Sequence, residues 1–148
     1  MPDSRQKYKL VLASSSHYRQ EIFDKLALNY ESISPDINES PLPFEAAEAL
    51  VARLALAKAK AAAAIIGARA TVAPSSGDKS TLYNETYLIA GSDQVAVIDN
   101  KIITKPHTHS NACEQLRRAS GREVIFLTSL CLYNTHTGAN QLTVVPYT

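Results

Sequence analysis

The chain has 148 residues, a length typical of one domain that spans residues 1–148 and buries its own core. Its charge is nearly balanced, with 15 lysine and arginine residues against 14 aspartate and glutamate residues. Neither a nucleic acid nor an acidic membrane surface is therefore the expected partner. The first residues are polar and no apolar run approaches the length of a membrane span, which favours the cytoplasm.

The first three elements are expected to be a buried strand, a helix and a second strand. The apolar run at 9–13 ends in three serines, a pattern typical of a strand that passes into a helix. We predict the helix over 18–28 and the next strand over 29–35. Three large apolar residues share one face of that helix, as in an amphipathic helix: Ile22, Phe23 and Leu26.

A polar loop marked by prolines at 35–43 precedes the longest predicted helix, over 45–66. This helix is rich in alanine and carries Glu45 and Glu48 in its first turn, where acids complement the helix dipole. Gly67 follows as a stop signal.

The segment 69–85 has little apolar content and no period, so we expect an exposed loop inserted within a single domain. Beyond it, 88–97 predicts a strand. A hairpin that turns at Asp99 and Asn100 should return the chain through Ile103.

The last elements are expected to be a short helix and a second hairpin. Ser110 or Asn111 would cap the helix, and Gly121 would stop it. The β-favouring run 123–132 should then pair with 141–145 across a polar turn. Helices and strands alternate early and hairpins dominate later, which predicts an α/β fold with a mixed sheet, because hairpins introduce antiparallel pairs.

Neither the cysteines nor the histidines show metal-ligand spacing. Cys113 and Cys131 lie outside any Cys-x-x-Cys pattern, which favours buried free thiols. The sequence also lacks the motifs of P-loop NTPases, dinucleotide-binding Rossmann folds and nucleophile-elbow hydrolases, which argues against those classes. We expect all four histidines to be solvated: His17, His107, His109 and His136.

Polar clusters at the ends of predicted elements have the chemistry of a phosphate site. Ser14 to Ser16 precede a helix, whose free N–H groups bind anions, and Arg19 adds a planar fork of donors. The alternative is an ordinary serine cap with a solvated arginine.

Lys58 lies on the apolar stripe of the longest helix, at spacings of three and four residues. Either its ammonium reaches solvent at the edge of the stripe, or it enters a pocket where a phosphate offsets its desolvation. Arg53 lies about a quarter-turn away from the stripe, so its expected role is structural. The stripe consists of Val51, Leu54, Lys58, Ala61 and Ile65.

Glu39 and Asp93 form a candidate acid pair for a hard divalent cation, since magnesium takes one or two carboxylates besides phosphates and waters. Asp93 interrupts an apolar strand and would also serve to deprotonate a water for attack on phosphorus. Lys105, held by Pro106, would neutralise a phosphate oxygen. Each of these residue types is usually solvated, but together they supply the anion cradle, cations and metal site of phosphoryl chemistry.

The order of these clusters resembles the Maf family of nucleoside triphosphate pyrophosphatases. The resemblance runs colinearly through nearly the whole chain, over 12–19, 35–41, 51–59, 91–95, 105–106, 116–121 and 126–130. It implies the bent mixed β-sheet flanked by helices that this family shares with inosine triphosphatases. It also implies hydrolysis of a nucleoside triphosphate between the α- and β-phosphates, a divalent metal cation, Mg²⁺ or Mn²⁺, and a cytoplasmic homodimer.

The resemblance also assigns roles to residues of this chain. Asp93 would be the catalytic proton acceptor, and Glu39 and Asp93 would be metal ligands. Tyr18 and Gln94 resemble the specificity residues of the branch that acts on 7-methyl-GTP, not those of the branch that acts on dTTP and UTP. An aromatic face attracts a stacked cation such as 7-methylguanine by about 0.5 to 2 kcal/mol; the alternative is that Tyr18 only packs at the helix start. The phosphate-binding residues would be Ser14, Arg19, Lys58 and Lys105.

The chain also departs from the family pattern. Gln20 replaces the second arginine of a usual pair, and Ser129 replaces the glycine after Thr128. The segment 69–85 lengthens a connection that is usually short, and the sequence stops at Thr148, where we expect the C-terminal part of a second lobe to be lacking. Two alternatives therefore stay open: a nucleotide-binding regulatory protein without turnover, and an inactive truncated fragment.

Overall fold

The computed structural model describes residues 8–71 and 86–148. Each strand and helix predicted from the sequence has a counterpart in these residues, with shifted ends. In chain order the elements are β1 (Lys9–Leu12), α1 (His17–Lys25), β2 (Tyr30–Ser32), α2 (Ala47–Thr71), β3 (Tyr87–Ile98), β4 (Lys101–Ile103), α3 (His109–Ala119), β5 (Ile125–Asn134) and β6 (Asn140–Tyr147).

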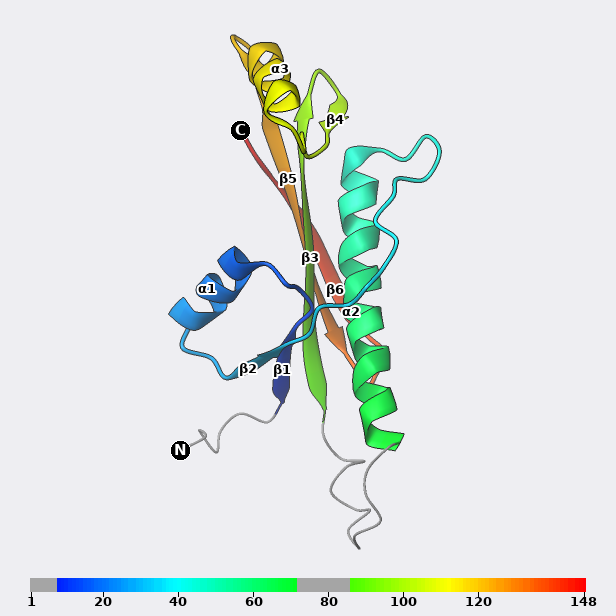
Figure 1. The fold of residues 1–148 in the computed structure, drawn as a ribbon. Helices are drawn as coiled ribbons and strands as arrows, with labels where there is room; N and C mark the ends of the chain where they lie inside the picture. The colour runs from blue at the N-terminus through cyan, green and yellow to red at the C-terminus, as the bar shows by residue number, and fades with distance from the viewer. Residues whose placement is uncertain (1–7, 72–85) are drawn as a thin grey trace, which may run out of the picture.

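The described strands form one mixed sheet in the order β2-β1-β3-β5-β6, and β4 pairs with β3 beside this path. β1 runs parallel to β2 and β3, whereas β3–β4, β3–β5 and β5–β6 are antiparallel pairs. Figure 1 shows α2 along one side of the sheet, α1 on the other side, and α3 at the end where β4 turns. The predicted mixed α/β sheet with flanking helices is thus confirmed.

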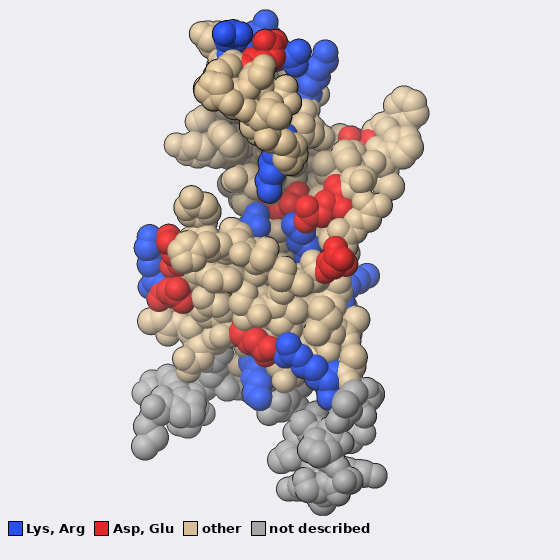
Figure 2. All heavy atoms as spheres, in the orientation of Figure 1, with Lys and Arg blue, Asp and Glu red and all other residues tan. Residues whose placement is uncertain are grey.

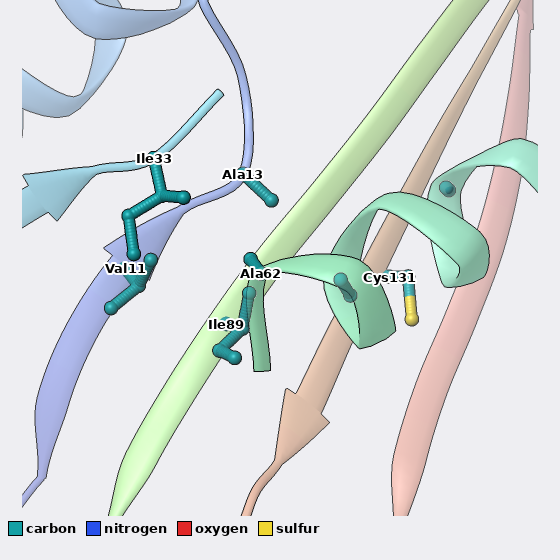
Figure 3. Packing of buried hydrophobic residues seen from close by; sticks show 8 residues of the cluster. Val11, Ala13, Ile33, Ala62, Ile89 and Cys131 are labelled. Carbon is teal, nitrogen blue, oxygen red and sulfur yellow. The ribbon is translucent and has the colours of Figure 1, made fainter. Parts of the chain in front are cut away.

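The core lies between α2 and the sheet, where small residues let the two backbones approach closely. A Cβ atom at Gly91 of β3 would lie 2.1 Å from the carbonyl oxygen of Ala55, so this crossing requires glycine. The contact fixes α2, which carries Lys58, against β3, which carries Asp93. Figure 3 shows the buried side chains of this core, which also include Val11, Ala13, Ile33, Ala62, Ile89 and Cys131.

The buried face of α2 begins as predicted and then shifts. Val51, Leu54 and Lys58 are buried, whereas the predicted continuation through Ala61 and Ile65 is only half-buried. Only small side chains fit the close approach to β3, so the fully buried residues further along the helix are alanines: Ala55, Ala59 and Ala62.

α2 both begins and ends later than predicted. It starts at Ala47, so Glu45 precedes the helix and only Glu48 lies in its first turn; the prediction for Glu45 is wrong. The helix continues through Gly67 to Thr71, so the expected stop at Gly67 is wrong. Gly67 is exposed and has open space around it; such a glycine costs a helix about 1 kcal/mol, which good helix formers on both sides offset. Residues 69–71, expected to begin a loop insertion, instead form the last turn of the helix. The rest of the proposed insertion, 72–85, lies outside the described residues.

α1 packs less than its apolar period predicted. The helix ends at Lys25, and Ile22 and Leu26 are 56% and 58% exposed. Phe23 is half-buried, with its ring edge-on to Tyr30 at 5.2 Å between centroids. Because β2 is only three residues long, it offers α1 little surface to bury.

The predicted hairpins are confirmed. The β3–β4 connection turns at Asp99 and Asn100, whose φ angles of 50° and 63° both lie in the left-handed region. Two such residues define a type I′ turn, whose twist matches the strands that it joins. The segment between β5 and β6 forms the second turn, as expected.

α3 begins at a different cap from the one predicted. Thr108 is its N-cap, and the Thr108 Oγ1 atom accepts the backbone N–H of Asn111 at 3.1 Å. Ser110 and Asn111, the two residues expected as caps, both lie inside the helix. Gly121 follows the helix end with a φ of 71°, as the predicted stop requires.

The predicted burial is correct for one of the two cysteines and for the histidines. Cys131 is buried and free, as predicted, but Cys113 is half-buried, with its Sγ atom 3.6 Å from Nε2 of His109. A buried Cys113 was a wrong expectation because α3 buries none of its residues. The four histidines are exposed, as predicted. Among the described helices, none is long and apolar enough to cross a membrane.

Candidate active site

The residues proposed from sequence surround one surface hollow of about 770 Å³. This volume is within the range of small-molecule sites, about 300 to 1,000 Å³. Figure 2 shows acidic and basic side chains gathered where this face of the molecule is hollowed. All eight proposed residues line the hollow: Ser14, Tyr18, Arg19, Glu39, Lys58, Asp93, Gln94 and Lys105. The fold therefore brings them together, while the role of each stays a prediction.

The β1–α1 connection lines the part of the hollow where the sequence predicts an anion site. Ser16 is the N-cap of α1, and its Oγ atom accepts the backbone N–H of Arg19 at 3.5 Å. The Oγ atom of Ser14 accepts both the N–H of Ser16 at 3.0 Å and Nη1 of Arg19 at 3.3 Å. Ser14 thus holds the guanidinium at the positive end of the helix dipole, a position where both would attract an anion.

Lys58 is buried, and its ammonium joins two acids. Its Nζ atom lies 3.0 Å from Oδ1 of Asp93 and 2.8 Å from Oε1 of Glu39. Only 11% of the lysine side chain is exposed, so the alternative of an ammonium that reaches into solvent is wrong. The Lys58 ammonium therefore lies between Glu39 and Asp93, the two acids predicted from the sequence to bind a metal.

Asp93 is held in place by its backbone as well as by Lys58. The N–H of Asp93 donates to Oγ of Ser129 at 3.0 Å, and that hydroxyl lies 3.2 Å from the Asp93 carbonyl oxygen, to which it donates. Ser129 is fully buried on β5, directly opposite Asp93 in the register. The sequence indicated Ser129 only as a departure from the family pattern, and its role as a brace for Asp93 was missed.

The two acids suit a magnesium or manganese ion. Both carboxylates already share one cationic partner, and Mg²⁺ is typically bound by one or two carboxylates together with phosphate oxygens and waters. No cluster of three or more His, Cys, Asp or Glu side chains able to hold a metal occurs in residues 8–71 and 86–148. Two carboxylates leave the other positions around such a cation to phosphate oxygens and waters.

Tyr18 and Gln94 lie where a ligand could meet them. Tyr18 is 79% exposed on the first turn of α1, so it does not simply pack at the helix start. Gln94 lies next to Asp93 on β3, and its Nε2 atom donates to Oγ1 of Thr128 at 2.7 Å. Sequence reasoning missed Thr128 as the partner of this amide, because the contact depends on the register between β3 and β5.

The segment after β4 carries Lys105 into the hollow and is braced by α3. The Nε2 atom of Gln115 donates to the Thr104 carbonyl oxygen at 2.5 Å, and Nδ2 of Asn111 donates to the Pro106 carbonyl oxygen at 3.0 Å. His107 also lines the hollow, although the sequence indicated only solvent exposure for it.

The fold is a mixed α/β sheet in which two lysines, an arginine and two acids line one hollow beside the start of a helix. The family comparison agrees: the Maf-like protein family model matches residues 9–147, so the chain belongs to that family.

Within this family, the chain is similar to curated bacterial relatives that share one name. The chain is 46% identical over 138 residues to a 7-methyl-GTP pyrophosphatase of Nitrosococcus oceani, a match covering 93% of this chain and 60% of that protein. It is 45% identical over 148 residues to a protein of the same name in Pseudomonas aeruginosa, with 100% and 65% covered. The chain thus spans about three fifths of the length of the relatives that it matches.

Proposed function

We propose that this protein hydrolyses the α–β phosphoanhydride of 7-methyl-GTP, or of a related modified or noncanonical nucleotide, to the nucleoside monophosphate and pyrophosphate. The observation that carries the proposal is the Glu39–Lys58–Asp93 cluster, which shares one hollow with the anion-binding start of α1. The names of the curated relatives support the same reaction.

The triphosphate would lie along the cationic wall of the hollow. The free N–H groups at the start of α1 and the Arg19 guanidinium would bind one phosphate group, and Lys105, which also lines the hollow, would bind another. Ser14 would orient Arg19, since its hydroxyl already accepts a hydrogen bond from one nitrogen of the guanidinium. These contacts would hold the reacting phosphate near Asp93 and supply charge where the leaving pyrophosphate develops it.

Asp93 would accept a proton from the attacking water. Lys58 engages Oδ1 of Asp93, and the second carboxylate oxygen, Oδ2, would take the proton as the water oxygen bonds to phosphorus. The bridging P–O bond of the α–β anhydride then breaks, and pyrophosphate leaves. Ser129 keeps the Asp93 backbone in register during this step through both of its hydrogen bonds.

Glu39 and Asp93 would hold the divalent cation, Mg²⁺ or Mn²⁺. When bound, such a cation supplies Lewis-acid stabilisation of negative charge on the phosphate oxygens. Lys58 would then exchange part of its contact with the two acids for contact with the substrate phosphates, which are also anionic.

The base would be selected at Tyr18 and Gln94. The exposed Tyr18 ring is available to stack on a cationic 7-methylguanine, an interaction worth about 0.5 to 2 kcal/mol. With its Nε2 atom committed to Thr128, Gln94 would offer Oε1 to the N–H donors on the guanine edge. A homodimer in the cytoplasm, which the family resemblance implies, is part of the same proposal and is checked by sedimentation and by fractionation.

The test is pyrophosphate release from a panel of nucleoside triphosphates with Mg²⁺ or Mn²⁺. We expect 7-methyl-GTP to be the preferred substrate and Asp93→Asn to reduce kcat by at least about 100-fold, as for loss of a general base. Asp99→Asn is the matched control, because Asp99 lies at the exposed β3–β4 turn and pairs with Arg122. Nucleotide binding without any pyrophosphate release would favour a regulatory protein instead.

A further inference from the structure

The carboxylate of Glu39 comes from a segment without regular structure. Residues 33–46 connect β2 to α2 and contain no strand or helix, and 58% of the Glu39 side chain is exposed. A side chain on such a segment has a defined position only if something orders the backbone around it, because an unordered backbone costs about 1–2 kcal/mol per residue to fix. The contact between Glu39 and Lys58 therefore needs a second point of attachment nearby.

Arg53 of α2 supplies that attachment. Its Nε and Nη2 atoms bind the two carboxylate oxygens of Glu45 at 2.7 and 2.8 Å, a bidentate pair. The same Nη2 atom donates to the carbonyl oxygen of Ser40 at 3.1 Å, at the residue that follows Glu39. Arg53 thus holds the connection at two places, Ser40 and Glu45, on either side of the turn at 43–44.

Glu45 completes the clamp from the side of the segment itself. Its Oε1 atom accepts the N–H of Leu42 at 3.1 Å, and its own N–H donates to the Leu42 carbonyl oxygen at 3.1 Å. The Arg53 guanidinium lowers the pKa of the Glu45 carboxyl to about 2, so the pair stays charged at neutral pH. Arg53 and Lys58 lie on one rigid helix, about 7.5 Å apart along its axis at 1.5 Å per residue.

We propose that Arg53 is a positioning residue that holds Glu39 at the Lys58–Asp93 pair and thereby sets the affinity of the site for its divalent cation. α2 binds the β2–α2 connection through Arg53, and it binds the Glu39 carboxylate through Lys58. Without the clamp, Glu39 has to be ordered by the cation itself, and the cation binds more weakly. The inference rests on the proposed function, in which Glu39 and Asp93 hold that cation.

The first measurement is Mn²⁺ binding in the presence of nucleoside monophosphate, followed by the electron paramagnetic resonance signal of free Mn²⁺. We expect Arg53→Met to raise the dissociation constant about tenfold, the lower end of the effect seen for residues that orient metal ligands. Arg53→Lys keeps the charge but cannot form the bidentate pair, so it should weaken binding nearly as much. Glu45→Gln should act in the same direction.

The matched control is Arg69→Met, since Arg69 lies on the same helix and also pairs with a glutamate, Glu31, but away from the hollow. It should leave Mn²⁺ binding within about twofold of wild type, in keeping with the small energies of exposed pairs. The decisive comparison is made in the Glu39→Gln background. If Arg53 acts through Glu39, Arg53→Met adds little there; an equal loss in both backgrounds would overturn the proposal.

A second readout does not depend on catalysis or metal. Amide hydrogen exchange of residues 38–44 in the metal-free protein should be faster in Arg53→Met than in wild type, with β3 unchanged. Unchanged exchange in that segment would also overturn the proposal. Failure of the proposed function looks different: wild type would release no pyrophosphate from any nucleotide, while the exchange result would still show whether Arg53 orders the segment around Glu39.

Discussion

Lys58 of α2 and Asp93 of β3 form an ion pair between helix and sheet, with Nζ 3.0 Å from Oδ1. Both side chains are largely withdrawn from solvent, at 11% and 14% exposure. The pair is therefore part of the packing between α2 and β3 as well as of the candidate site, and changes at either residue should affect stability together with chemistry.

Lys58→Met should destabilise the protein, because it leaves the Asp93 carboxylate without its cationic partner. We expect a loss of about 2 kcal/mol in the free energy of unfolding, the usual scale for a hydrogen bond between charged groups. Urea unfolding of Lys58→Met beside the exposed control Lys60→Met measures this. Adding Asp93→Asn to Lys58→Met should recover part of the loss; a fully additive double variant would contradict the coupling.

Gly91 and Gly67 should respond in opposite directions to alanine. A Cβ at Gly91 would overlap the Ala55 carbonyl oxygen at 2.1 Å, so Gly91→Ala should cost at least about 1–3 kcal/mol, as overpacking does. Gly67 lies in the exposed part of α2 with open space around it, so Gly67→Ala should stabilise by up to about 1 kcal/mol. Thermal and urea unfolding distinguish the two, and equal effects would be inconsistent with the close crossing.

The local parts of the fold and site could be predicted because each has its own chemical signal. The hairpin turn was predicted at Asp99 and Asn100, and the start of α1 was predicted from the serines before it. The stripe on α2 placed Lys58 on the apolar face of the helix, and the structure shows that the side chain is buried there. These features depend on residues within a few positions of one another.

The remaining parts could not be predicted because they depend on long-range register. Ser129 meets Asp93, and Thr128 meets Gln94, only once β3 and β5 pair in one alignment. No local pattern predicts that alignment. The exposure of Ile22 is a similar case, since an apolar period indicates a face but not whether anything covers it.

Stability should fall in acid as the clamp on the β2–α2 connection loses its charge. The pKa of Glu45 is lowered to about 2 from an ordinary value of 4.5, chiefly by its hydrogen bonds with Arg53. A lowered folded-state pKa stabilises fully above the unfolded value, and this contribution is lost as pH falls from about 4.5 toward 2. Glu45→Gln should therefore lie closer to wild type in unfolding free energy at pH 3 than at pH 6. A difference that does not change between the two pH values would show that the carboxylate charge is not involved.

Thr128 should tune the choice of nucleotide without taking part in the reaction. Thr128→Val keeps the shape of the side chain but removes the oxygen that accepts the Gln94 amide at 2.7 Å, so the amide can turn and offer a donor in place of Oε1. Loss of one neutral hydrogen bond is worth about 0.5–1.5 kcal/mol, which predicts a two- to tenfold fall in the kcat/KM ratio of 7-methyl-GTP over UTP. We expect the fall to come from KM for 7-methyl-GTP, with kcat nearly unchanged, because Asp93 and its partners are untouched. Thr128→Ser retains the hydroxyl and should restore the preference; if Ser and Val behave alike, the hydrogen bond does not position Gln94.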